Sequence, residues 1–135
     1  MSLDVTPLVD SSTKIIKSYS DDGFVINNEK ISDNIIIYYD KLLNWSFTDN
    51  DDIYTSLVSA VLVVNNQSSD KIELLILGTG KTILHIPEAV KNQFRENNIS
   101  LEIVDSGAAC RTYNSLIAEG RKVAAAILKS NYSVE

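Results

Sequence analysis

The sequence contains few of the residues on which several common kinds of protein depend. Its one cysteine, Cys110, cannot form a disulfide within the chain, which suits a reducing compartment. Its one histidine, His85, and that single cysteine do not make a structural zinc site. No uninterrupted apolar run approaches the roughly 20 residues that span a bilayer. We therefore expect no structural disulfide, no bound metal and no integral membrane segment.

Positive charge is also scarce, above all in the first half of the chain. The formal net charge is −6. Residues 1–70 contain eleven acidic residues and four lysines, whereas residues 71–135 contain seven acidic and eight basic residues. A chain with this balance lacks the positive charge that grips phosphate backbones, so we expect no nucleic-acid partner.

The N-terminus has neither the basic region nor the apolar stretch of a secretory signal, and it is not typical of a mitochondrial presequence. We expect a cytoplasmic location of the bacterial type, with peripheral attachment to the inner membrane as an alternative. Residues 1–12 are expected to form a flexible lead-in, and residues 13–135 a single domain. The hydrophobic fraction of 44% is sufficient for a core.

The first half of the domain is typical of β-structure followed by one helix. An apolar stripe over residues 53–64 has helical spacing, although Val61–Val64 alone would also suit a strand. Trp45 and Phe47 are expected in a loop that packs over an edge of the core. The remaining predictions are a strand at 14–19, a turn at 21–23, a second strand at 24–26, a polar turn at 27–30, a third strand at 35–39, a helix start at 49–52 and a loop at 65–70.

The second half predicts alternating strands and helices. Strands are expected at 72–77 and 99–104, with a helix between them that begins at Pro87 and stops at Asn97-Asn98. An apolar stripe from Ala109 to Leu128 predicts one long helix, or two helices with a break. Strand, helix and strand in this order predict two parallel strands whose carboxyl ends share one edge of the sheet, where α/β proteins bind ligands.

Two segments are distinctive together, LLILGTG at Leu74–Gly80 and LEIVDSGAACRTYNSLIAEGRKVAAAIL at Leu101–Leu128, with weaker matches at Ile16–Tyr19, Gly23-Phe24 and Trp45. The chain resembles the domain of unknown function 498 family, whose fold is named after a methanogen protein. The resemblance implies an α/β, three-layer domain with a central mixed β-sheet, flanking helices and an added β-hairpin layer. The family has no agreed enzymatic activity, and its mitochondrial members are linked to assembly of respiratory complex I. A respiratory complex subunit is therefore the expected partner.

Gly78-Thr79-Gly80 and Asp105-Ser106-Gly107 follow the two parallel strands and are expected to line a crevice. The first loop is no dinucleotide motif, because it lacks a third glycine and six residues separate Gly80 from Pro87. It either holds an anion on its N–H groups or only makes a tight turn. Asp105 contacts a ligand hydroxyl, caps a helix or forms a salt bridge to an arginine, and Ser106 is a plausible N-cap.

Three further residues complete the candidate ligand set: His85, Arg111 and Asn114. Arg111 is expected to form ion pairs on the helix surface or to contact a partner protein. Asn114 is expected to mark a helix break, where its side chain binds a backbone group. Cys110, His85 and Asp105 have no spacing typical of a catalytic triad, and Cys110 is better explained as a small buried thiol. No catalytic residue and no cofactor is assigned. Two functions stay open: a non-enzymatic assembly or binding factor, and a small-molecule or anion-binding protein with or without catalysis.

Overall fold

The computed structural model describes residues 12–45, 53–81 and 85–129, which form an α/β fold. The first half is mostly β-structure, and strands alternate with helices in the second half. The elements are β1 (Ile16–Ser20), β2 (Gly23–Ile26), β3 (Glu29–Ile31), β4 (Ile35–Tyr38), β5 (Lys41–Asn44), α1 (Ile53–Gln67), β6 (Leu74–Gly78), α2 (Glu88–Glu96), β7 (Ser100–Val104), α3 (Ser106–Ala118) and β8 (Val123–Ile127).

A five-stranded mixed sheet runs through the middle of the molecule in the order β5-β4-β8-β6-β7. β6 pairs in parallel with both β7 and β8, whereas β4 pairs antiparallel with β5 and β8. The first three strands form a separate antiparallel sheet in the order β1-β2-β3. These pairings confirm the predicted hairpin of the first two strands and the predicted parallel pair.

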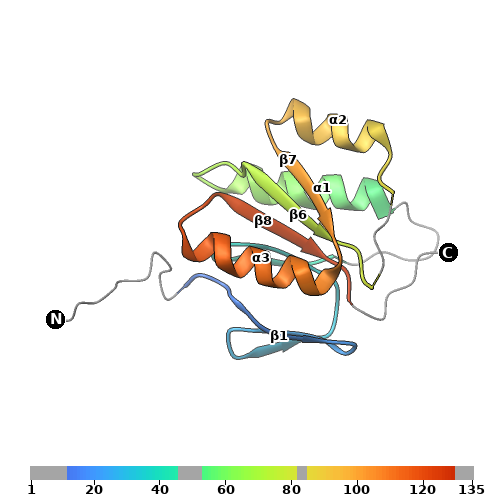
Figure 1. Cartoon of the computed structure of the whole chain (residues 1–135). Helices are drawn as coiled ribbons and strands as arrows, with labels where there is room; N and C mark the ends of the chain where they lie inside the picture. The colour runs from blue at the N-terminus through green and yellow to red at the C-terminus, as the bar shows by residue number, and fades with distance from the viewer. Residues whose placement is uncertain (1–11, 46–52, 82–84, 130–135) are drawn as a thin grey trace.

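Figure 1 shows three layers: α1 and α2 over one face of the five-stranded sheet, the sheet itself, and α3 with the three-stranded sheet on the other face. The central strands are buried on both faces. In β4, for example, Ile36 belongs to the core beneath α1 and α2, while Ile35 and Ile37 belong to the core beneath α3 and β2. The three-layer prediction is confirmed, and the added β-layer has three strands rather than the two of a hairpin.

The predicted helix from Ala109 to Leu128 is wrong beyond residue 118. α3 ends at Ala118, Gly120 takes the left-handed φ of 78°, and the chain returns as β8 in the centre of the sheet. Every residue of β8 is buried. An unbroken apolar run fits helical and strand periods equally well, so periodicity could not separate them. Residues 124–126 therefore form the middle of a strand and not part of a helix.

The other differences are local. β3 and β5 were not predicted, and α1 continues three residues beyond Val64 before its end at Gln67. Val61–Val64 is helical, which decides the alternative left open by its composition. Trp45 is 2% exposed, as expected for a residue that packs on the core. Phe47, the helix start at 49–52 and the lead-in up to residue 11 lie outside the described residues.

Candidate functional site

The carboxyl ends of β6 and β7 meet at one edge of the sheet, and the two loops that follow them bind each other directly. Thr79 N–H donates to the Val104 carbonyl at 3.0 Å. Gly80 N–H donates to the Ser106 hydroxyl at 2.7 Å, and Ser106 N–H donates to the Gly80 carbonyl at 2.8 Å. The loop predicted to open a crevice is therefore joined to the neighbouring loop by main-chain and side-chain hydrogen bonds.

Ser106 extends this connection to a third strand. Its hydroxyl also donates to the Leu128 carbonyl at 2.6 Å, just beyond β8, and the residue is fully buried. Ser106 is not the N-cap that the sequence favoured, because Asp105 takes that position and accepts a hydrogen bond from Ala108 N–H at 2.8 Å. The capping alternative for Asp105 is thus confirmed, while Ser106 links the ends of β6, β7 and β8.

Gly78 allows α3 to approach the sheet closely. A Cβ added at this position would lie 2.8 Å from the Ala109 Cβ, 3.0 Å from Ile127 Cγ2 and 3.0 Å from the Ser106 Cα. Two of these contacts come from α3 and one from β8, so a side chain here would push the helix off the sheet. Gly80 has φ of 83°, which turns the chain back after β6.

Arg111 and Asn114 lie elsewhere, in a groove of about 260 Å³ between β1 and α3. The Asn114 amide accepts from Ile16 N–H at 3.0 Å and donates to the Ile16 carbonyl at 2.7 Å, so it ties β1 to the helix. The helix continues past Asn114, so the predicted break is wrong, although the predicted backbone contact is confirmed.

Arg111 is exposed, and its Nη1 lies 3.4 Å from the position that a Cβ would take if Gly107 had a side chain. Lys17 of β1 also lines the groove, although no pattern in the sequence singled it out, and its ammonium group donates to the Asn28 side chain at 3.2 Å.

Cys110 and His85 are not arranged as a nucleophile and its base. Cys110 is 6% exposed, and burial raises the pKa of its thiol from 9.0 to about 12, against an opposing effect of the nearby Arg111 guanidinium. A thiol with that pKa is protonated at neutral pH and is a poor nucleophile. His85 is exposed, and its carbonyl accepts from the Tyr54 hydroxyl of α1, on the opposite face of the sheet from α3.

The eight candidate residues thus fall in three places. The strand ends hold Gly78, Thr79, Gly80, Asp105 and Ser106, the β1–α3 groove holds Arg111 and Asn114, and His85 lies near α1. Their role in ligand binding stays a prediction. Across residues 12–45, 53–81 and 85–129, three or more potential metal-binding side chains nowhere gather into a cluster. In the same residues, no helix has the length and apolar character to cross a bilayer.

A second groove, which the sequence did not suggest, lies beside the edge strand β7. It has a volume of about 530 Å³ and is lined by Lys91 and Arg95 of α2 and by Leu101 and Ile103 of β7, among others. Lys91 and Arg95 are four residues apart and so share one side of α2. That spacing was visible in the sequence, but only the pairing of strands places it beside an open edge.

Comparison with known proteins identifies the family. The model of a protein family of unknown function, DUF498/DUF598, matches residues 16–128, from β1 to the residue after β8. The chain belongs to this family. Among its relatives, NADH dehydrogenase [ubiquinone] 1 alpha subcomplex assembly factor 3 of Xenopus tropicalis is 29% identical over 113 residues, which cover 84% of this chain and 60% of that protein. The human protein of the same name is 27% identical, with 84% and 59% coverage. The chain thus spans about 60% of the length of these relatives.

Solved structures support the same fold. A protein of Bartonella henselae, described as an outer membrane protein, is 30% identical, with a TM-score of 0.74 and coverage of 87% of this chain and 95% of that one. A Bordetella pertussis protein described as a Mth938-like domain has a TM-score of 0.77 at 23% identity, with 99% and 96% coverage, and supports the fold alone.

Proposed function

We propose that this protein is a non-enzymatic binding factor that acts in the assembly of a respiratory complex by holding a protein subunit. The observation that carries the proposal is the match over 84% of the chain to a protein named as an assembly factor of NADH dehydrogenase. The family model matches residues 16–128, which include the two sheets and three helices that the structure describes, so the family shares the folded domain. A cytoplasmic location, with peripheral contact to the inner membrane as the alternative, belongs to the same proposal.

The geometry supports binding rather than catalysis. The residues at the strand ends, where α/β enzymes usually bind substrates, use their polar groups on one another. The thiol of Cys110 is held protonated, and His85 lies near α1 rather than α3. These features favour a surface that contacts another protein over a site that activates a small substrate.

Gene deletion tests this function. We expect a deletion strain to contain less assembled NADH dehydrogenase, measured by native gel electrophoresis and by NADH oxidation in isolated membranes. A plasmid copy of the gene should restore both. Unchanged levels of the assembled complex in the deletion strain would contradict the respiratory role.

The groove between β1 and α3 supports a second candidate function, the binding of a small anionic molecule. Lys17 and Arg111 line a space of about 260 Å³ together with Gly107, in the first turn of α3. The Lys17 ammonium group also donates to Asn28, so Arg111 is the better candidate to contact an anion. A ligand that binds only the folded protein raises its melting temperature, so nucleotides and organic acids can be screened by thermal unfolding. We expect any stabilising compound to lose its effect in Arg111→Ala. A flat screen counts against this candidate and leaves the assembly role untouched.

A further inference from the structure

The outer side of β7 is an edge of the five-stranded sheet. Ser100 N–H donates to the Glu73 carbonyl, and the Val104 carbonyl accepts from Thr79 N–H, so both residues direct their main-chain groups toward β6. Main-chain groups alternate in direction along a strand. The N–H and C=O groups of Leu101 and Ile103 therefore point away from the sheet. Within the residues that the structure describes, β6 is the only strand that pairs with β7.

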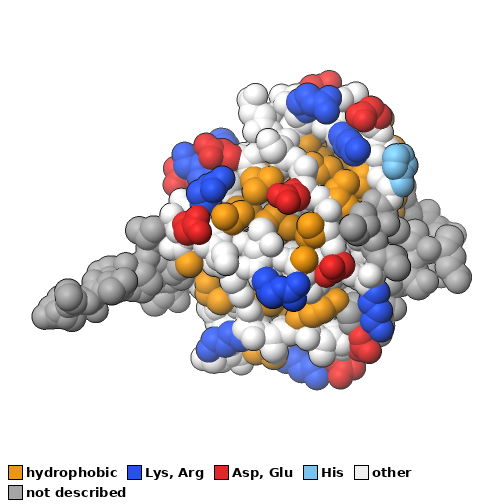
Figure 2. Space-filling view, in the orientation of Figure 1, with side chains coloured by type: hydrophobic (Ala, Val, Ile, Leu, Met, Phe, Trp, Pro, Cys, Tyr) orange, Lys and Arg blue, Asp and Glu red, His pale blue; other side chains and the backbone are white. Residues whose placement is uncertain are grey.

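A groove lined by basic, uncharged polar and apolar residues follows this open side. Leu101 and Ile103 are half-buried and line it from β7, while Lys91 and Arg95 line it from α2. Figure 2 shows hydrophobic side chains across the middle of this face with an acidic side chain among them, and both basic and acidic side chains above them over α2. None of the described residues that line the groove is acidic. Lys91 and Arg95 also form no ion pair with any described carboxylate.

We propose that β7 receives an extended segment of a partner protein as an additional strand, and that this segment carries an acidic side chain next to apolar ones. The Leu101 and Ile103 main chains supply the hydrogen bonds that an added strand requires. Alternate side chains of that strand point toward the α2 face, where they meet the apolar surface of the two residues and the charges of Lys91 and Arg95. The complementary charge for that position is a carboxylate.

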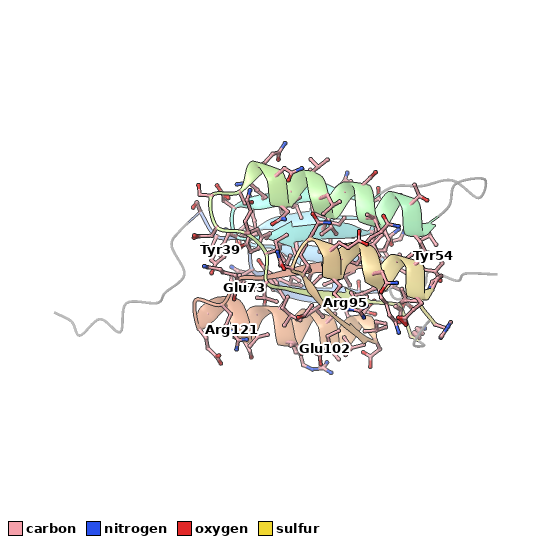
Figure 3. All side chains as sticks on the ribbon, turned by 90° about the horizontal axis from the view of Figure 1, so that it is seen from above. Tyr39, Tyr54, Glu73, Arg95, Glu102 and Arg121 are labelled. Atoms are coloured by element: carbon pink, nitrogen blue, oxygen red, sulfur yellow. The ribbon has the colours of Figure 1, made fainter. Side chains whose placement is uncertain are left out.

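A second copy of this chain suits the edge less well. Antiparallel pairing of two β7 strands over all five residues would place Glu102 directly opposite its counterpart. Like charges in that position are unfavourable. Figure 3 shows Glu102 at the outer edge of the molecule, where such a partner would have to lie. Each copy also carries a net charge of −6. The occupant is therefore a different protein with an acidic segment.

The inference rests on the proposed function, because it names how the assembly factor holds its subunit. Two variants test it. Ile103→Pro removes an outward N–H without removing a bond to β6, and proline is tolerated only at such edges. The double variant Lys91→Glu/Arg95→Glu reverses the charge of the groove and leaves β7 intact. Its matched control is Lys30→Glu/Arg121→Glu, which changes the net charge equally at exposed positions elsewhere. Thermal unfolding establishes that each variant is folded.

The binding probe is a displayed library of random twelve-residue peptides, selected on the wild-type protein. We expect the selected peptides to carry an apolar and an acidic residue two positions apart, so that both side chains face α2, and to shift the amide resonances of residues 100–104. Ile103→Pro and Lys91→Glu/Arg95→Glu should each weaken binding at least about 10-fold, while the control variant binds as wild type. The double variant keeps the test valid if Ile103→Pro does not fold. The proposal is overturned if no peptide is enriched, if the resonances that shift lie away from β7, or if the wild type is a dimer that Ile103→Pro makes monomeric.

Complementation of the deletion strain separates the two proposals. If the wild-type gene restores the assembled complex and both variants restore it equally well, the β7 surface is not the binding site, although the assembly function stands. If deletion has no effect on the complex, the assembly function fails, and the peptide experiment still decides whether β7 accepts a strand.

Discussion

The carboxyl ends of the parallel strands and the outer side of β7 are only a few residues apart, but their main-chain groups differ in hydrogen bonding. At the strand ends, Gly80, Ser106 and Leu128 satisfy one another in a buried network. Along β7, Leu101 and Ile103 direct their groups outward from the same strand whose end is closed. The strand ends, where the fold predicts ligand binding, are thus joined by hydrogen bonds, whereas within the described part of the chain no strand pairs with the outer side of β7.

Amide hydrogen exchange is the most direct test of this difference between the strand ends and the outer side of β7. Exchange free energies in one protein range from near zero to the full free energy of unfolding. We expect the amides of Thr79 and Gly80 to exchange at least about 1,000-fold more slowly than those of Leu101 and Ile103, measured by NMR in deuterated buffer. Equal protection of the two groups would mean that the outer side of β7 is already covered, and the contrast would fail.

The next largest expected effect is on the free energy of unfolding, when Gly78 is replaced by alanine and compared with the same change at Gly107. Gly78→Ala places a Cβ against Ala109, Ile127 and the Ser106 backbone, and overpacking of this kind costs about 3 kcal/mol of unfolding free energy. Gly107→Ala is the control, because its closest contacts are 3.4 Å and alanine favours the helix. Chemical denaturation measures both. A neutral Gly78→Ala would show that α3 can move away from β6 without cost.

Ser106→Ala tests the polar network itself. The change leaves Gly80 N–H and the Leu128 carbonyl without their partner in a buried position, so we expect a loss of about 2 kcal/mol. Ser115→Ala, at an exposed position on the same helix, should change stability by less than about 0.5 kcal/mol. If the two variants were equally stable, the strand ends would not depend on Ser106.

The smallest expected effect is the pH dependence of stability that is due to the buried Cys110 thiol of α3. The Cys110 thiol ionises near pH 12 in the folded protein but near pH 9 when exposed, so the unfolded chain loses its proton first. Stability therefore falls as pH rises above 9, by about 1 kcal/mol at pH 10 from this group. Cys110→Ala should remove that part of the slope between pH 9 and 10. Tyr38 and Tyr113, whose pKa values burial also raises, should sustain a fall at higher pH in both proteins. An unchanged slope in Cys110→Ala would show that the thiol is accessible in the folded state.

The candidate site was only partly predictable because its residues were selected by strand direction. That reasoning correctly brought Gly78–Gly80 and Asp105–Ser106 to one edge, where they touch. It could not tell that a hydroxyl would fill the space between the loops. Arg111 and Asn114 follow closely in sequence, but helix rotation turns them toward β1. His85 was expected in a loop that lines the crevice, whereas its carbonyl accepts from Tyr54 of α1, on the opposite face of the sheet from α3.

The sequence by itself determined the α/β class and the parallel pair of β6 and β7. It also determined both ends of α2 to within one residue, since Pro87 directly precedes its first residue, Glu88, and Asn97 directly follows its last, Glu96. Each of these features depends on local patterns or on residues with restricted backbone geometry. Only the tertiary structure decided that residues 123–127 form the central strand, since an all-apolar run takes whichever form its neighbours can bury. Tertiary structure likewise decided which strand became the open edge. Edge position depends on the order of strands in space, which no local pattern along the chain records.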